Sequence, residues 1–227
     1  MPRAKKASSG GAAGFGRPEL NGSAVTEAGL QIVAEEGWDG LTMPRLAERL
    51  GVDTVALYDE VPGRAALLRR FGDTFDRAMA STPRGDLAGM GVRDRLFDLM
   101  MRRFEAMQPH RDGLERLTRD ARRAPELLAA GCCTVDRMAD RLLDLADIRT
   151  SGLRRRLARR ALSAVYLATY RTWTTDGSED LASTMAELDK RLGQLDRLAS
   201  FACRMRRAGG RRRAESRDEP PADAMPA

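Results

Sequence analysis

Apolar residues recur every three or four positions along most of the chain between residues 20 and 207, which is the period of an amphipathic α-helix. In the first such segment Val25, Ile32 and Val33 share one face, and Gly37 supplies a stop. Leu, Ala, Arg, Glu and Met are frequent, Gly and Pro stand mostly at segment edges, and no stretch alternates as a strand requires. The sequence therefore predicts an all-α protein.

The breaks between the periodic segments divide the chain into about nine expected helices. Their ranges are 20–36, 42–50, 53–58, 64–79, 92–107, 111–122, 125–146, 151–174 and 177–207. A linker rich in Gly at residues 83–91 separates an N-terminal domain, residues 19–80, from a C-terminal helical bundle, residues 81–207. Residues 1–18 and 208–227 are small, charged or Pro-rich, so we expect a disordered basic arm and a disordered tail.

Two short helices near residue 50 are joined by a tight turn. Thr42 is a suitable N-cap for the first, and Pro44 stands in the first turn, where its missing N–H costs no intrahelical hydrogen bond. Gly51 tolerates the positive φ of a turn, and Asp53 can cap the second helix. Together with helix 20–36, the pair predicts a three-helix domain that contains a helix-turn-helix.

Residues 41–71 resemble the signature of the TetR family of transcriptional regulators. The positions that carry the resemblance follow the family's order, and they are Leu41, Thr42, Ala47, Gly51, Val52, Asp53, Leu57, Tyr58, Arg64, Leu67 and Leu68. The resemblance implies a regulator that binds double-stranded operator DNA as a homodimer. It also implies a repressor that a small apolar effector releases.

Six residues are expected to contact DNA. Thr54 and Val55 face base edges or thymine methyl groups in this interpretation. Phosphate contacts, which position the duplex, are expected from Thr42, Tyr58 and Arg64, and Arg45 is expected to contact DNA as well. Two alternatives stay open: Thr42 serves only as a helix cap, or Tyr58 only packs on the following helix.

The net charge of +6 and the pI of about 9.8 suit nucleic-acid binding, but the excess lies near the chain ends. Residues 1–18 carry +4 and residues 203–217 carry +6, whereas residues 20–70 hold five basic and eight acidic side chains, a net charge of −3. Asp59 and Glu60 stand where members of the family usually have His and an aromatic residue. Because affinity for DNA depends largely on neutralised phosphates, we expect this acidic domain to need the basic arm.

Two apolar stripes in the last two expected helices require a partner. In the last helix the stripe follows alternating steps of four and three, at Leu181, Met185, Leu188, Leu192, Leu195, Ala199 and Ala202. In the helix before it, the stripe contains Leu153, Leu157, Ala161, Ala164 and Ala168. We expect the two helices of each subunit to form a four-helix dimer interface. The residues selected for it are Leu157, Ala161, Leu181, Met185, Leu188, Leu192 and Leu195. The alternative is a seam within a single chain.

Methionine and aromatic residues gather in the expected bundle, where the family resemblance places an effector pocket. Met suits such a pocket because it adapts to irregular shapes. The selected residues are Met100, Phe104, Met107, Met138, Tyr170 and Trp173. They fit an ordinary core as well, and that alternative stays open. His110, the single histidine, is expected to be a loop or cap residue.

A second resemblance concerns the C-terminal half. Residues 104–120 and 162–192 are similar to lipid-binding accessory proteins of ubiquinone biosynthesis, which reuse the TetR fold. The cationic stripe at residues 154–160 suits this alternative, because basic amphipathic helices bind anionic membrane surfaces. A solvated helix face is the simpler interpretation of the same stripe.

Other classes of protein find little support in the sequence. Paired carboxylates, a Ser/His/Asp set and a Gly-rich phosphate loop are not evident, so we expect neither an enzyme nor a cofactor. The three cysteines lack a C-x-x-C spacing, and we expect no metal site. No apolar run reaches the length of a membrane span, and we expect a cytoplasmic protein.

Overall fold

The computed structural model describes residues 21–83 and 85–215, with side chains for residues 21–83 and 85–200. All regular structure in these ranges is helical. The helices are α1 (Gly22–Gly40), α2 (Met43–Leu50), α3 (Thr54–Glu60), α4 (Arg64–Ala80), α5 (Val92–Met107), α6 (Arg111–Asp120), α7 (Pro125–Leu145), α8 (Gly152–Thr175) and α9 (Ala182–Glu215), with a 3-10 turn Gln108–His110 before α6. The prediction of an all-α protein is confirmed.

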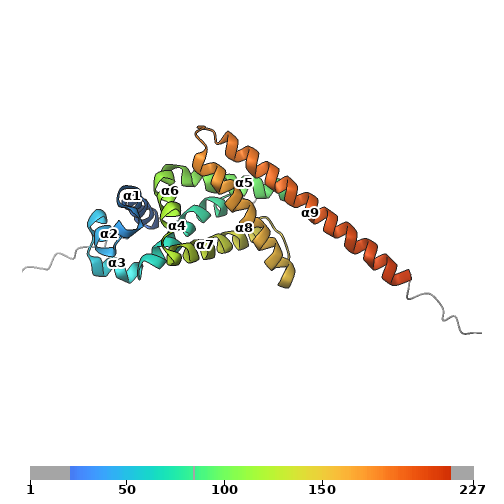
Figure 1. Ribbon diagram of the computed structural model, residues 1–227, viewed down its shortest axis with the longest axis horizontal. Helices are drawn as coiled ribbons and strands as arrows, with labels where there is room; N and C mark the ends of the chain where they lie inside the picture. The colour runs from blue at the N-terminus through green and yellow to red at the C-terminus, as the bar shows by residue number, and fades with distance from the viewer. Residues whose placement is uncertain (1–20, 84, 216–227) are drawn as a thin grey trace, which may run out of the picture.

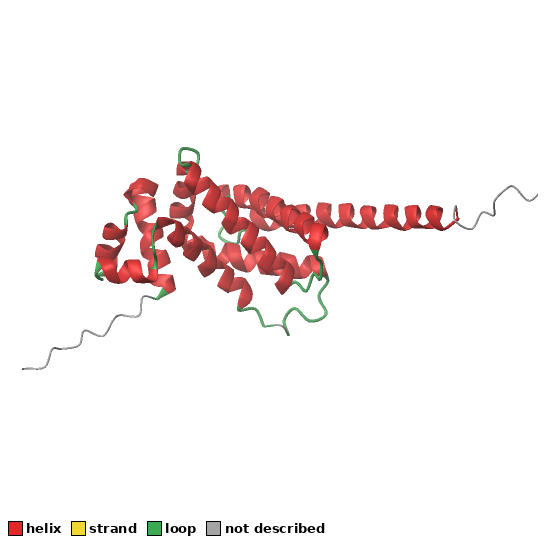
Figure 2. Cartoon of the chain, turned by 90° about the horizontal axis from the view of Figure 1, so that it is seen from below, coloured by secondary structure: helices red, strands yellow, loops and turns green. Residues whose placement is uncertain are grey.

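The helices form a head, a body and a projecting helix (Figure 1). Helices α1, α2 and α3 make up the head at one end, and α4 leads from the head into the bundle. Helix α9 packs against α8 and α5 and then extends beyond the body, as Figure 2 also shows. No helix among the described residues is long and apolar enough to cross a membrane.

The first and last helices differ most from the sequence-based expectation. Helix α1 continues to Gly40, although Gly37 interrupts its helical geometry with a φ of 80°. Helix α9 begins at Ala182, because the Asp176 carboxylate holds the preceding turn by accepting hydrogen bonds from the Ser178 and Thr184 N–H groups at 3.1 and 2.8 Å. Hydrogen bonds from the hydroxyl groups of Ser178 and Thr184, together with these backbone bonds, hold the pKa of the Asp176 carboxyl well below its usual range.

The C-terminal end of the helical region also needs correction. Helix α9 runs to Glu215, eight residues past residue 207, where the sequence predicted a disordered tail to begin. The predicted arm at residues 1–18 and the rest of the predicted tail, residues 216–227, lie outside the described residues.

The head is docked on the bundle through a close approach of α6 to α1. Gly113 of α6 is buried, and a Cβ atom at this position would lie 2.4 Å from the carbonyl oxygen of Leu30 in α1. Nearby, the backbone N–H of Trp38 donates to Oδ2 of Asp120, at the end of α6, over 2.8 Å. These contacts fix how the head is oriented relative to the bundle.

A buried charge network ties α4 to the bundle. Asp76 of α4 and Arg103 of α5 are each about 4% exposed, and the Arg103 Nε donates to Oδ1 of Asp76 over 2.9 Å. Arg141 of α7 donates to the other carboxylate oxygen over 2.6 Å, and Arg103 also donates to the hydroxyl of Tyr166 in α8. Buried charges remain ionised at a tolerable cost only when they are paired in this way. The network therefore joins α4 to three helices of the bundle.

We predict that Gly113→Ala destabilises the protein, although Ala favours a helix over Gly by about 1 kcal/mol. The added methyl group would meet backbone, which cannot rotate away, so α6 must shift from α1. The matched control is Gly131→Ala in α7, where nothing lies within 4 Å of the added atom. Chemical denaturation should show a lower free energy of unfolding for Gly113→Ala and a slightly higher one for Gly131→Ala. Equal stability of the two variants would contradict the close approach.

Candidate nucleic-acid interface

Local hydrogen bonds define both helices of the helix-turn-helix. The Thr42 hydroxyl oxygen accepts from the N–H of Arg45 over 3.3 Å and caps α2. Gly51 ends α2 in the left-handed conformation, with a φ of 67°. The Asp53 carboxylate accepts from the N–H of Val55 over 2.8 Å and caps α3. The capping roles predicted for Thr42, Gly51 and Asp53 are confirmed.

Helix α3 has a buried face and an exposed face. Leu57 is fully buried, as is Leu46 of α2, and both belong to the core that includes α1. On the opposite side Val55 is 68% exposed and Tyr58 is 46% exposed, while Thr54 is half-buried. Tyr58 is therefore not sealed against α4. The exposed face of α3 can enter a groove of about its own width, as recognition helices do.

Carboxylates neutralise the two arginines of α2. The Nε and Nη2 atoms of Arg45 donate to Oε1 of Glu36 over 3.1 and 2.8 Å, and its Nη1 donates to Glu48 over 2.9 Å. Arg49 binds Glu35 with contacts of 2.6 and 3.2 Å. The sequence did not reveal these pairs, because Glu35 and Glu36 belong to the preceding helix, and each lies nine or more positions before the arginine that it binds.

These ion pairs affect protonation and the access of an anion. The hydrogen bond from Arg49 lowers the pKa of Glu35, and the bonds to Glu36 and Glu48 raise the pKa of Arg45. Glu35, Arg45 and Arg49 therefore stay charged at neutral pH. A phosphate that approaches Arg45 must displace a carboxylate, which is feasible because solvent-exposed ion pairs are weak.

Arg64 binds another residue of the head instead of pointing toward solvent. Its Nη2 donates to the carbonyl oxygen of Trp38 over 2.5 Å, and its guanidinium stacks over the Trp38 ring at 4.0 Å from the centroid. This contact holds the start of α4 against the end of α1, and the prediction that Arg64 contacts phosphate gains no support from the geometry. The role of Trp38 was not predicted from the sequence, although an aromatic residue directly after the helix stop at Gly37 was a usable signal.

The residues selected for an effector pocket come together as packed core. Five of the six are fully buried, and the ring centroids of Phe104 and Trp173 lie 6.1 Å apart. Trp173 Nε1 donates to Gln108 over 3.0 Å, and the Tyr170 hydroxyl donates to the Leu114 carbonyl oxygen over 3.2 Å. The structure thus favours the alternative of an ordinary core for Met100, Phe104, Met107, Met138, Tyr170 and Trp173.

The residues selected for a dimer interface divide into two groups. Leu181, Leu188 and Leu192 are buried within the subunit, where α9 packs against α8 and α5. They cannot also contact a second subunit, so for these three the intrachain alternative replaces the prediction. Met185, Leu195 and Ala161 are partly buried, and Leu157 is exposed.

Comparison with known protein families agrees with the geometry of the head. The family described as bacterial regulatory proteins, tetR family, matches residues 25–71, and the family described as COQ9 matches residues 129–199. The HTH-type transcriptional repressor DrrR1 of Streptomyces coeruleorubidus is 43% identical over 61 residues, which cover 27% of this chain and 23% of that protein. The chain thus matches about a quarter of the length of this relative.

Solved structures share the arrangement of helices over about three quarters of the chain. A TetR transcriptional regulator from Nitrosomonas europaea has a TM-score of 0.61 at 18% identity, over 76% of this chain and 96% of that one. A TetR transcriptional regulator from Rhodococcus sp. RHA1 has a TM-score of 0.52 at 17% identity, over 76% and 93%. At these identities the similarity shows the fold.

Fold and site together define a helical protein of two parts, in which a bundle carries a helix-turn-helix head. The head matches the tetR family of bacterial regulatory proteins over residues 25–71, and the fold is that of TetR regulators of known structure. The COQ9 match covers α7, α8 and the first part of α9, and it confirms the second resemblance noted in the sequence.

The neutralised arginines generate a prediction about affinity for DNA. Replacing both Glu36 and Glu48 by Gln keeps the side-chain size but frees Arg45 for a phosphate. We expect tighter binding to a mixed-sequence duplex, and a plot of log K against log salt that is steeper by about one unit. Fluorescence anisotropy over a salt series measures both quantities. Glu126→Gln, at an exposed position in α7, is the control and should change neither. Unchanged binding of the double variant would show that Arg45 does not contact DNA.

Proposed function

We propose that this protein is a transcriptional regulator that binds operator DNA through the exposed face of α3. The observation that carries the proposal is the placement of Val55 and Tyr58: both side chains are exposed on the recognition helix of a TetR-family head, while Leu57 fixes the helix from the other side. Thr54 and Val55 would face base edges, and a methyl-bearing side chain suits the thymine methyl group.

Phosphate contacts would come from the rim of the same face. The hydroxyl groups of Thr42 and Tyr58 are exposed at the two ends of the helix-turn-helix, where the duplex backbone passes in this docking mode. Arg45 joins them once its carboxylate partners are displaced. Because the described head is acidic, the basic residues of segment 1–18 supply the remaining charge in this proposal. By analogy with the repressor DrrR1, we infer that binding represses transcription.

We expect Val55→Ala to weaken binding to the DNA upstream of the protein's own gene about tenfold, because two methyl groups buried at the interface contribute about 1.5 kcal/mol. Tyr58→Phe removes one phosphate contact and should weaken binding to any sequence. Val92→Ala, at another exposed valine, is the matched control and should leave binding intact. Anisotropy titrations at two salt concentrations test all three. Equal affinity of Val55→Ala and Val92→Ala would exclude α3 as the recognition helix.

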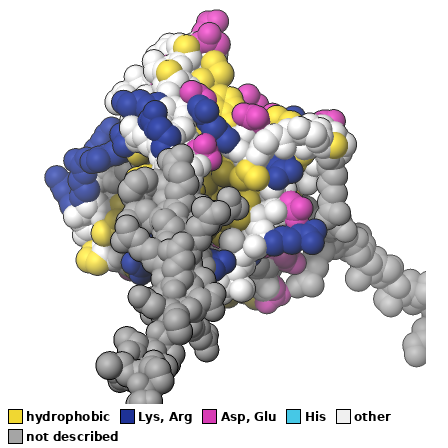
Figure 3. All heavy atoms as spheres, turned by 90° about the vertical axis from the view of Figure 1, so that its right-hand side faces the viewer, with side chains coloured by type: hydrophobic (Ala, Val, Ile, Leu, Met, Phe, Trp, Pro, Cys, Tyr) yellow, Lys and Arg dark blue, Asp and Glu magenta, His cyan; other side chains and the backbone are white. Residues whose placement is uncertain are grey.

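We further propose that two copies pair through the outer face of α8 and the projecting part of α9. Leu153 and Leu157 are 71% and 60% exposed, and Leu167 continues the same face of α8. Leu198 is exposed on α9, which extends beyond the body to Glu215 (Figure 2). Most of the stability of a helix in a protein comes from packing of its apolar face, so a partner helix beside the projecting part is expected. Figure 3, which looks onto this end of the molecule, shows hydrophobic side chains among basic and acidic ones.

Leu157→Glu should convert the dimer to a monomer, because it places two charges in the apolar contact, and should weaken DNA binding in parallel. Leu128→Glu is the matched control, at an exposed leucine of α7, and should preserve the dimer. Sedimentation velocity distinguishes the two states. A wild-type protein that remains a monomer at tens of micromolar, or a Leu157→Glu variant that remains a dimer, would contradict the proposed interface.

A lipid-binding accessory role is the second candidate function. It is favoured by the COQ9 match and by the outer face of α8, where Arg154, Arg156 and Arg160 are exposed between the leucines and form no ion pair within the described part of the chain. Such a face suits an anionic bilayer surface. Retention on anionic vesicles together with an absence of DNA binding in the anisotropy titrations would favour this candidate over the regulator.

A further inference from the structure

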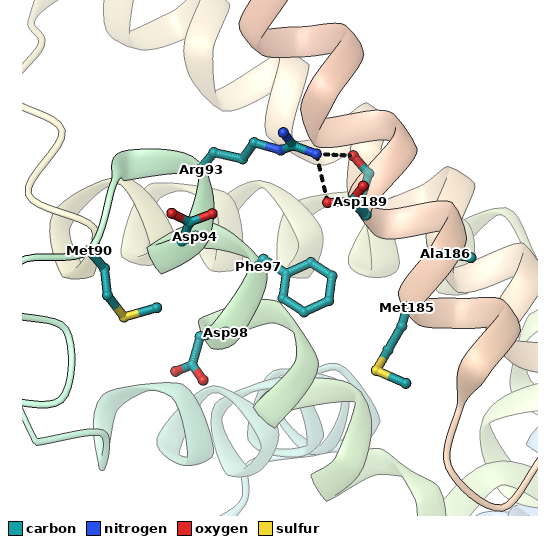
Figure 4. A pocket seen from close by; sticks show the side chains of 8 residues that line it. All are labelled: Met90, Arg93, Asp94, Phe97, Asp98, Met185, Ala186 and Asp189. Carbon is teal, nitrogen blue, oxygen red and sulfur yellow. Dashed lines mark hydrogen bonds and ion pairs between the residues drawn. The ribbon is translucent and has the colours of Figure 1, made fainter.

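A groove between α5 and α9 has the size of a small-molecule site (Figure 4). Its volume is about 440 Å³, within the usual range for such sites. The Phe97 ring points from α5 into the space between the helices, Met185 faces it from α9, and Met90 lies at the open end before α5. These three side chains give the groove an apolar lining, and the two methionines can adapt to an occupant.

The polar rim of the groove is mainly acidic. Asp94 and Asp98 lie one turn apart on α5, and Asp189 lies opposite on α9. Arg93, the one basic lining residue, already binds Asp189 over 2.6 Å and the Asp189 carbonyl oxygen over 3.3 Å. Asp98 accepts from Arg102 over 2.8 Å, whereas Asp94 has no ion-pair partner among the described residues.

We propose that this groove binds an amphipathic monocation. The apolar body lies against Phe97 and Met185, and the positive group lies beside Asp94 and Asp98. An anion would meet several carboxylates and a guanidinium that is already paired, and a neutral molecule would gain no attraction from the acidic rim. The Phe97 ring adds a favourable face for a cation. The site is separate from the packed core residues in which the sequence placed an effector.

The consequence for regulation rests on the proposed function as a DNA-binding regulator. A positive group beside Asp94 and Asp98 repels the neighbouring Arg93 and so weakens its link to Asp189, the polar connection between α5 and α9. Helix α5 also carries Arg103, which binds Asp76 of α4 in the buried network. A shift of α5 on ligand binding is therefore passed to α4 and to the head, and the cation acts as the effector.

Tetraphenylphosphonium and tetraphenylborate test the proposal, because they share shape and apolar surface and differ in charge. Isothermal titration calorimetry of the full chain should show binding of the phosphonium and none, or far weaker binding, of the borate. The double variant D94N/D98N should lose about tenfold or more in affinity for the phosphonium. D112N, at an exposed carboxylate of α6, is the control and should bind as the wild type does.

Equal binding of the two probes, or undiminished binding to D94N/D98N, would overturn the proposal. A change in oligomeric state of D94N/D98N without phosphonium binding to the wild type would also overturn it, in favour of a second copy as the occupant. These measurements need no DNA, so they are independent of the proposed regulator function. With DNA present, the phosphonium should lower the affinity of the wild type and leave that of D94N/D98N unchanged.

Discussion

The packing of α1 against α6 is the constraint on which the placement of the head depends. Helix α1 contacts α2 and α4 within the head and α6 of the bundle, so it belongs to both parts. The approach at Gly113 is so close that no side chain fits between the Leu30 carbonyl and α6. Because backbone meets backbone there, the orientation of α1, and with it that of α2 and α3, follows the position of α6.

The second connection between head and bundle carries charge. Asp76 lies on α4, twelve residues beyond Arg64, which stacks on Trp38 at the end of α1. Helix α4 is therefore held at its start by the cation–π contact of Arg64 with Trp38, and further along by the buried ion pair of Asp76 with Arg103. Removing either partner of a buried pair is strongly unfavourable, so α4 and α5 are expected to move together. Helix α5 also contributes Arg93 and Phe97 to the groove. The groove is thus connected to the head through α5, the buried ion pair and α4.

The sequence was sufficient wherever the determinants are local. Helix periods, the Thr42 and Asp53 caps and the left-handed Gly51 depend on residues within one or two turns, and the structure reproduces them. It was insufficient wherever a side chain chooses between distant partners. The stripe of Leu181, Leu188 and Leu192 has the same spacing whether its partner is α8 of the same chain or a second subunit.

The partners of charged side chains were also hidden in the sequence. Arg45 and Arg64 stand where a basic residue suits a phosphate, but folding brings Glu36 to the first and Trp38 to the second. The groove was equally hidden, because Asp94 and Met185 are about ninety positions apart and neither belongs to a motif. Periodicity gives the face of a helix on which a residue lies, whereas the partner on that face is decided by tertiary packing.

The acidity of the head affects which contacts can contribute to a free energy of binding to DNA. Val55 and Tyr58 are exposed and contribute little to the stability of the core. Their face of α3 can contribute to binding instead. With Arg45 and Arg49 held by carboxylates, the described head offers little net attraction to a general duplex. Under the proposed function, contacts that depend on base identity, such as a methyl group meeting thymine, would form a larger share of the binding energy than in a basic head. Such a head would give up general affinity for DNA and gain discrimination between sites.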